Sequence, residues 1–268
     1  MPELPEVETV RNTLKHFVLN QKIENVEVFY DSIITGDTSE FKSSVSNNRI
    51  VDIQRKGKYL IFILDDCAFV SHLRMEGKYH IVEKGNYPKH THVVFHLEHQ
   101  DLIYIDVRKF GRMQLVDKEH YLLQSPLNKL GDEPKDIDID TLYFKLHSLN
   151  TPIKTTLLDQ SIMCGIGNIY ADEIVYRMQC DPRTRSSKLS KNRVLELKKH
   201  ATDVLNEAIL QGGTTIRSFD SNGIHGLFQV SLNVHTQKTC KVCHTDIKKI
   251  TLNGRGTYYC PKCQKKRY

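Results

Sequence analysis

Apolar residues near the start of the chain recur at helical spacing, at Val7, Val10, Leu14 and Phe17. This period predicts a helix that begins within a few residues of Pro2. Short runs rich in β-branched and aromatic residues follow, separated by turn residues. The runs are Ile23–Tyr30, Arg49–Arg55, Tyr59–Leu64, Ala68–His72, Lys78–Val82, His92–Leu97, Leu102–Asp106 and Met113–Val116. Their close spacing predicts an antiparallel β-sandwich or barrel behind the first helix.

Near residue 118 the strand patterns stop, and residues 118–134 have the character of a connector. We expect at least four helices after it. The clearest is Ser190–Gln211, with Ser190 as its N-cap and Gly212-Gly213 at its end. The predicted fold class is therefore an α+β multidomain protein. Its parts are a sandwich domain at 1–117, a linker at 118–130, a helical domain at 131–234 and a C-terminal module at 235–268.

Two Cys-x-x-Cys pairs lie in that last module. Cys240-Lys-Val-Cys243 and Cys260-Pro-Lys-Cys263 are separated by sixteen residues, a spacing typical of a four-thiolate structural zinc site. Four thiolates leave no open position for water, so the zinc has no catalytic role. Between the pairs, Ile247–Leu252 and Arg255–Tyr259 alternate like strands around Asn253-Gly254, which favours a two-residue hairpin turn.

Charge and cysteine content narrow the class of protein. The chain has 268 residues with 38 Lys+Arg against 32 Asp+Glu, a mild formal charge of +6. Residues 235–268 hold nine basic side chains and one acid, which suits a phosphate backbone. There are seven cysteines, no secretory signal and no apolar run of membrane-spanning length. We therefore expect a reducing, cytoplasmic location with no membrane association.

The second residue can carry chemistry. If Met1 is removed, Pro2 becomes a secondary amine, and a terminal amine has a pKa of about 8. Such an amine can attack a sugar aldehyde carbon and form an iminium, as a lysine does in Schiff-base catalysis. Glu3 and Glu6 lie beside it in sequence and can move protons.

Other features taken singly allow two interpretations. The turn Cys164–Tyr170 lets Asn168 cap the next helix or help to bind a phosphate, but a plain interhelical turn also explains it. Met75 lies near a turn and is compatible with core packing. Arg108 and Phe110 follow a strand and point the same way, so they can fill the gap left by an extruded base or serve as loop residues.

Taken together, the motifs resemble those of bacterial formamidopyrimidine-DNA glycosylases, a family of oxidised-purine repair enzymes. The matching segments are Pro2–Glu8, Lys56–Leu60, His72–Gly77, Asp106–Gly111, Leu157–Gln160, Gly165–Ala171 and the cysteine module with Arg255. The resemblance implies an N-terminal β-sandwich with a leading helix, a helix–two-turn–helix domain and a zinc-finger hairpin. It implies a monomer that binds double-stranded DNA with an oxidised base or abasic site, near the nucleoid, and holds one structural zinc.

The resemblance also implies roles for individual residues. Pro2 resembles the nucleophile, Glu3 the proton shuttle, and Lys58 and Arg255 the residues of the elimination steps. The residues expected at the DNA are Glu6, His72, Met75, His90, Arg108, Phe110, Lys154 and Asn168. Among these, Met75, Arg108 and Phe110 resemble the side chains that occupy the vacated base stack, and Asn168 resembles a phosphate clamp.

Some positions depart from the family pattern. Asp132, Leu149 and His235 replace the residues usual in the family, and the base-reading loop, expected within Ser218–Gln229, is variable. Two alternatives therefore stay open. One is the related branch that acts on oxidised pyrimidines, although its chains begin Pro-Glu-Gly-Pro-Glu and this one has Leu4. The other is a damaged-DNA-binding protein without catalytic activity.

Overall fold

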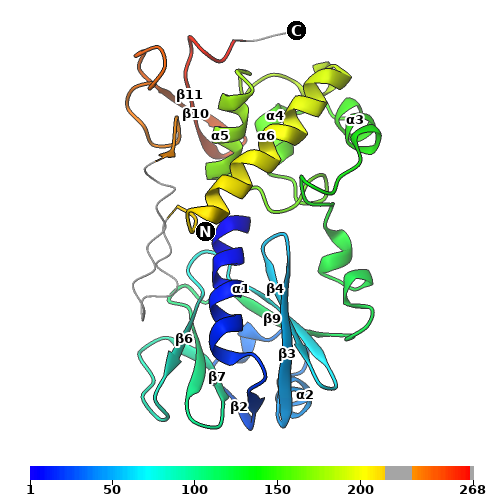
Figure 1. Ribbon diagram of the computed structural model, residues 1–268, viewed down its shortest axis with the longest axis vertical. Helices are drawn as coiled ribbons and strands as arrows, with labels where there is room; N and C mark the ends of the chain where they lie inside the picture. The colour runs from blue at the N-terminus through cyan, green and yellow to red at the C-terminus, as the bar shows by residue number, and fades with distance from the viewer. Residues whose placement is uncertain (215–230, 266–268) are drawn as a thin grey trace. The chain divides into compact units, whose positions relative to one another are not determined.

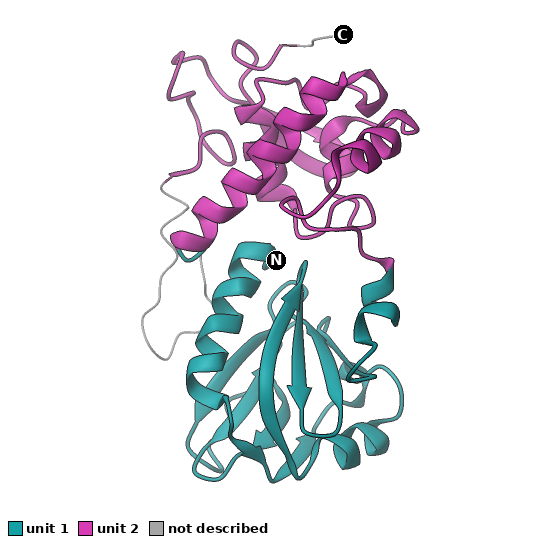
Figure 2. Ribbon diagram, turned by 45° about the vertical axis from the view of Figure 1, so that its right-hand side comes forward, with its two compact units in different colours: residues 1–128, 212–226 teal, residues 129–211, 227–268 magenta. Residues whose placement is uncertain are grey.

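A computed structural model of the chain describes residues 1–214 and 231–265. The chain forms two compact units, Met1–Asn128 with Gly212–Gly226, and Lys129–Gln211 with Leu227–Tyr268 (Figure 2). The expected base-reading loop, Ser218–Gln229, lies outside the described residues. Within 1–214 and 231–265, no helix has both the length and the apolar character needed to cross a membrane.

The first unit begins with helix α1 (Leu4–Val18), which confirms the helix predicted from the apolar period. Val7, Val10 and Leu14 are at most 1% exposed, so the predicted face is the buried one. Lys15 of α1 pairs with Asp52 of β3 at 2.5 Å, so α1 lies alongside β3 (Figure 1).

Two antiparallel sheets follow. The first has the order β1 (Lys22–Ile23), β3 (Asn48–Lys56), β4 (Tyr59–Leu64), β5 (Ala68–His72) and β9 (Arg112–Val116). The second has the order β2 (Asn25–Val28), β7 (Thr91–His96), β8 (Asp101–Ile105) and β6 (Lys78–Val82). The predicted strands are confirmed, except that the run Ile23–Tyr30 is divided between the two sheets.

A short helix, α2 (Thr38–Val45), was not predicted from the strand-rich pattern around it. It forms because Asp37 caps it, accepting a hydrogen bond from the Glu40 N–H at 2.7 Å. Phe41 and Val45, one turn apart, are both fully buried. A single 3₁₀ turn, η1 (Asp31–Ile33), precedes it.

The core of the first unit lies between the sheets. Phe62 of β4 stacks on Phe69 of β5 with ring centroids 4.5 Å apart. Phe69 then stacks on Phe95 of the second sheet at 5.6 Å. All three rings are fully buried, so the predicted sandwich is confirmed.

Two loops cross between these sheets at the same end of the sandwich. The β5–β6 loop carries Met75, and the β8–β9 loop carries Arg108 and Phe110. Since β5 pairs with β9 and β6 pairs with β8, the two crossing loops are neighbours.

The second unit contains the expected helices. They are α3 (Ile139–His147), α4 (Ile153–Leu157), α5 (Asn168–Arg177) and α6 (Lys191–Leu210). Short 3₁₀ turns lie at η2 (Tyr121–Leu123), η3 (Leu127–Lys129) and η4 (Ser186–Lys188), of which η2 belongs to the first unit and η3 spans the boundary. Ser190 caps α6 as predicted, because its hydroxyl accepts from the Arg193 N–H.

The hairpin of the cysteine module belongs to this second unit. Strands β10 (Lys248–Leu252) and β11 (Arg255–Tyr259) pair antiparallel in the predicted register around their turn. Asn253 and Gly254 both have positive φ, 46° and 74°, the left-handed backbone that this two-residue turn requires.

Candidate functional site

The start of α1 places the candidate nucleophile beside two carboxylates. Met1 is exposed and Pro2 is half-buried, whereas Glu3 and Glu6 are 2% and 4% exposed. Glu6 Oε2 accepts from the Glu3 N–H at 2.8 Å, a capping contact that fixes the first turn. The start of α1 thus holds Pro2, whose nitrogen becomes a secondary amine only once Met1 is removed, next in sequence to the buried Glu3.

Glu6 also joins this helix to the segment after α6. Its Oε1 accepts from the Thr214 N–H at 2.9 Å and from the Thr214 hydroxyl at 3.1 Å. Gly213 has φ +80°, and a Cβ there would lie 2.7 Å from Glu6 Oε1, so this position needs glycine. Glu6, which we expect at the DNA, thus also binds Thr214, and we call this Glu6–Thr214 contact the clasp.

Lys58 and His72 lie close together on the first sheet. Lys58 is 6% exposed and follows Gly57, which turns the β3–β4 hairpin with φ 56°. Tyr59 pairs with His72 across β4 and β5, with ring centroids 4.5 Å apart. Arg55, just before the turn, donates to Glu8 of α1 at 2.6 Å. The hairpin tip and the start of α1 therefore lie at the same end of this unit (Figures 1 and 2).

His72 is a neutral imidazole in this environment. Burial, the Arg74 charge and the Lys58 charge lower the pKa of His72 to about 3. Its Nδ1 accepts from the Arg74 N–H at 2.9 Å, so the ring proton is on Nε2. His72 can therefore donate one hydrogen bond without carrying a charge.

The two crossing loops present the apolar and cationic side chains singled out from the sequence. Met75 and Phe110 are 38% and 48% exposed, so both offer apolar surface outside the core. The Arg108 guanidinium lies 4.8 Å from the centre of the Phe110 ring, so the two side chains stack.

Asp106 builds the second of these loops from within. It is fully buried, and its carboxylate accepts from the backbone N–H groups of Arg108, Phe110 and Gly111 at 3.0, 2.9 and 2.7 Å. The carbonyl of His90 accepts from the Asp106 N–H at 3.1 Å, which places half-buried His90 beside the same loop.

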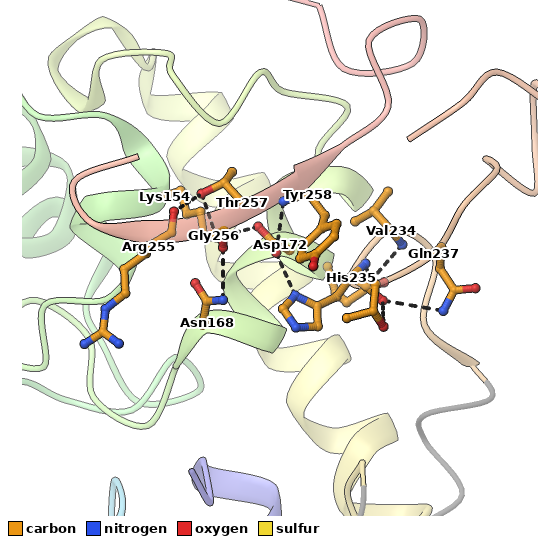
Figure 3. A network of polar contacts seen from close by, with 12 residues as sticks. Lys154, Asn168, Asp172, Val234, His235, Gln237, Arg255, Gly256, Thr257 and Tyr258 are labelled. Atoms are coloured by element: carbon orange, nitrogen blue, oxygen red, sulfur yellow. Dashed lines mark hydrogen bonds and ion pairs between the residues drawn. The ribbon is translucent and has the colours of Figure 1, made fainter. Parts of the chain in front are cut away.

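In the second unit, one carbonyl holds the hairpin that carries Arg255. The Gly256 oxygen accepts from Lys154 Nζ at 2.9 Å and from Asn168 Nδ2 at 3.0 Å (Figure 3). Arg255, the preceding residue, is exposed. Capping of α5 by Asn168, one of the interpretations that the sequence allowed, is not found, because Gly167 is the N-cap. The Asn168 side chain bonds the hairpin instead.

Lys154, expected at the DNA, is buried. It is 1% exposed, and its Nζ also contacts Asp172 Oδ1 at 2.7 Å and the Thr257 hydroxyl at 2.9 Å. The Lys154 ammonium is thus surrounded by acceptors of the protein itself (Figure 3). The buried Asp172 carboxylate, on another helix, draws the lysine inward, and the expected role of Lys154 at the DNA stays a prediction.

The four cysteines of the two pairs come together. Their sulfurs all lie within 4.8 Å of one another, with Cys240–Cys263 at 3.8 Å and Cys243–Cys260 at 3.4 Å. Zinc–sulfur bonds of about 2.3 Å in a tetrahedron put sulfurs about 3.8 Å apart. The cluster therefore fits one structural zinc.

Three protein-family models match successive parts of the chain. The formamidopyrimidine-DNA glycosylase N-terminal domain matches residues 1–113, and the H2TH domain of the same enzyme matches residues 130–220. A zinc finger found in FPG and IleRS matches residues 237–266, which confirms the predicted zinc site. The chain belongs to the formamidopyrimidine-DNA glycosylase family.

Individual members of this family are similar to this chain over almost their whole length. The formamidopyrimidine-DNA glycosylase of Oceanobacillus iheyensis is 46% identical over 273 residues, which cover 98% of each chain. That of Bacillus licheniformis is 43% identical, covering 99% of this chain and 100% of the relative. A crystal structure of Lactococcus lactis Fpg with N7-benzyl-Fapy-dG DNA has a TM-score of 0.93 and 37% identity, covering 99% of this chain and 100% of that one. Another, with abasic-site DNA, has a TM-score of 0.92 and 36% identity, covering 98% and 100%.

This glycosylase-family chain has buried carboxylates that the sequence analysis missed. Asp172 Oδ2 accepts from His235 Nδ1 at 2.7 Å, and Glu173 Oε1 accepts from the Val234 and His235 N–H groups at 2.9 and 3.0 Å. Both acids are 1% exposed. The available signal was a pair of adjacent acids among the largely apolar residues Ile169–Tyr176, since a buried charge needs partners.

The structure shows which contacts are made at the three positions that depart from the family pattern, Asp132, Leu149 and His235. His235 pairs with Asp172, as described above. The backbone carbonyl of Asp132 accepts from the Cys164 N–H at 3.0 Å, and that of Leu149 accepts from the Ser187 N–H at 3.1 Å. At positions 132 and 149 these contacts are made by the backbone, so they do not depend on the replaced side chains.

Proposed function

We propose that this protein is a bifunctional DNA glycosylase and abasic-site lyase that removes oxidised purines, 8-oxoguanine and formamidopyrimidines, from DNA. The observation that carries the proposal is the half-buried Pro2 beside the buried Glu3 at the start of α1. The damaged DNA bound by the Lactococcus lactis relatives supports the substrate class. The proposed setting is the bacterial nucleoid, with the protein acting as a monomer.

In the proposed reaction, processing removes the exposed Met1 and frees the Pro2 amine. The amine attacks C1′ of the damaged nucleotide, the bond from C1′ to the base breaks, and the departing base takes up a proton. Glu3 is placed to move the protons of this step. The nitrogen gives up its proton, the C1′–O4′ bond of the sugar breaks and O4′ takes up a proton, which leaves an iminium that joins Pro2 to the opened sugar.

Strand cleavage follows from the iminium, which acidifies the neighbouring C2′ protons. Loss of one such proton expels the 3′ phosphate, and a second elimination expels the 5′ phosphate. Lys58 supports the lyase steps beside a flanking phosphate, and Arg255 assists the last elimination. No further cofactor is required, because the iminium takes up the electron pair of the broken C–H bond as an enamine, and the departing phosphate then carries an electron pair away.

The DNA backbone is held by separate donors in the two units. Arg255 is exposed at the hairpin turn, and its guanidinium suits bidentate phosphate binding. The Asn168 amide nitrogen carries two protons, so its bond to Gly256 permits a second bond to a phosphate. His72 donates from Nε2. The zinc keeps the hairpin folded, and Lys154 acts from the interior by holding the carbonyl next to Arg255.

The exposed side chains on the crossing loops fill the base stack. Flipping a base out of the duplex costs a few kcal/mol, and damage lowers that cost. Met75 and Phe110 offer apolar surface to the gap, while the stacked Arg108 can donate to the base left without a partner. His90 lies beside this loop and contacts the DNA backbone.

Borohydride trapping on an 8-oxoguanine duplex, followed by peptide mapping, tests the proposal. The adduct should map to Pro2, and Pro2→Gly should reduce trapping strongly while the matched control Pro5→Ala retains it. Undiminished trapping by Pro2→Gly with its initiator methionine still attached would exclude Pro2 as nucleophile. A protein that only binds damage gives no adduct, and preferential cleavage of a thymine glycol duplex would assign the chain to the pyrimidine branch.

A further inference from the structure

A buried tyrosine lies beneath the two crossing loops. Tyr104, on β8, is fully buried and pairs with Tyr79 of β6, with ring centroids 5.2 Å apart. The Tyr79 hydroxyl donates to Ser71 at 2.7 Å. The Tyr104 hydroxyl instead reaches the end of the sandwich where both loops pass from sheet to sheet.

Two glycines meet the Tyr104 hydroxyl, one from each loop. A Cβ on Gly77 of the β5–β6 loop would overlap the hydroxyl oxygen, and so would a Cβ on Gly111 of the β8–β9 loop. Neither glycine has a left-handed backbone. Lack of space therefore excludes a side chain at both positions, and at Gly111 the tyrosine is the main obstacle, since a Cβ there would also lie 2.8 Å from Tyr104 Cζ.

The Tyr104 hydroxyl is protonated in this environment. Burial and the neighbouring Asp106 carboxylate raise the pKa of Tyr104 above its ordinary value, so the group stays protonated. Asp106 accepts from the Gly111 N–H at 2.7 Å. The tyrosine oxygen thus lies among Gly77, Gly111 and the carboxylate that shapes the second loop.

We propose that Tyr104 is a positioning residue whose hydroxyl sets the spacing between the two loops and so aligns Met75 with Arg108 and Phe110. Gly77 is two residues from Met75, and Gly111 adjoins Phe110, so a shift at either glycine moves the exposed side chains. The inference rests on the proposed role of these side chains in filling the base stack.

Tyr104→Phe removes only the hydroxyl and keeps the buried ring. We expect faster amide hydrogen exchange at residues 73–77 and 107–111, together with a loss of roughly tenfold in discrimination between bases opposite 8-oxoguanine. Tyr79→Phe is the matched control, because it removes a hydroxyl from the cross-strand neighbour. It should lower the melting temperature through the lost Ser71 bond while leaving loop exchange and base discrimination unchanged.

Gly111→Ala tests the contact itself. In the wild-type background it should increase exchange at residues 73–77, in the other loop, and this effect should shrink when Tyr104→Phe is also present. Equal effects in both backgrounds, or unchanged exchange in Tyr104→Phe, would overturn the inference. If exchange is coupled but Arg108→Ala and Phe110→Ala leave base discrimination intact, the proposed stack-filling role fails instead.

Discussion

Lys154 and Asp172 form an ion pair in the interior of the second unit, with Nζ and Oδ1 2.7 Å apart. Both side chains are at most 1% exposed. The same lysine donates to the Gly256 carbonyl, and the other Asp172 oxygen accepts from His235. One carboxylate therefore connects α4, α5 and the chain that leads into the zinc module, next to the strand that presents Arg255.

Removing one partner of this pair should be costly. Lys154→Met leaves the Asp172 charge buried without its cation, and we expect a loss of about 3–5 kcal/mol in the free energy of unfolding. The double variant Lys154→Met/Asp172→Asn should lose less than the sum of the single variants. Lys191→Met, which breaks the exposed pair with Asp140, is the control and should cost about 1 kcal/mol or less. Comparable losses in Lys154→Met and the control, measured by denaturant unfolding, would contradict this ranking.

The clasp between α1 and Thr214 depends on the charge of Glu6. Glu6→Gln puts an amide where two backbone N–H groups and a hydroxyl now donate to a carboxylate. We expect the free energy of unfolding to fall by about 1.5–3 kcal/mol. Hydrogen exchange of the Thr214 amide should become faster. Thr214→Val removes only the hydroxyl bond and should have a smaller effect. Exchange at Thr214 that does not respond to Glu6→Gln would show that the clasp is not formed.

His72 should contribute to acid sensitivity. Its pKa in the folded protein is about 3, below the ordinary value of 6.5, so between these pH values the unfolded chain binds the proton more readily. Its stabilising contribution is thus complete above pH 6.5 and is lost as the pH falls toward 3. His72→Asn keeps an acceptor for the Arg74 N–H but cannot titrate. The slope of unfolding free energy against pH should fall by up to about 1.4 kcal/mol per unit in this interval, and identical slopes would contradict the prediction.

Loss of zinc should weaken DNA binding through the hairpin. Cys260→Ser removes one thiolate, so zinc content and DNA affinity should fall together. The slope of log affinity against log salt concentration should decrease by about 1, because one phosphate contact, that of Arg255, is lost. Cys164→Ser, a buried cysteine outside the cluster, is the control and should retain zinc. A zinc-free variant with the original salt dependence would refute this role of the module.

Local patterns of the sequence were sufficient for much of the fold. The strands β4, β5 and β6 have the predicted bounds, because alternation and turn residues act over a few positions. The same holds for the Asn253-Gly254 turn and for the four-cysteine cluster, because the hairpin predicted between the two cysteine pairs brings them together. Helix α2 was missed because the only local signals for it are the Asp37 cap and two apolar residues, Phe41 and Val45, between segments with strand patterns.

The sequence by itself determined the sandwich, the zinc hairpin and the family to which the chain belongs. Only the tertiary structure decided that Lys154 is buried, that Glu6 holds Thr214, and that Tyr104 lies between Gly77 and Gly111. These three facts depend on contacts between segments far apart in the chain. Whether a polar group meets solvent, substrate or another side chain is set by which distant segment packs against it, and no local period carries that information.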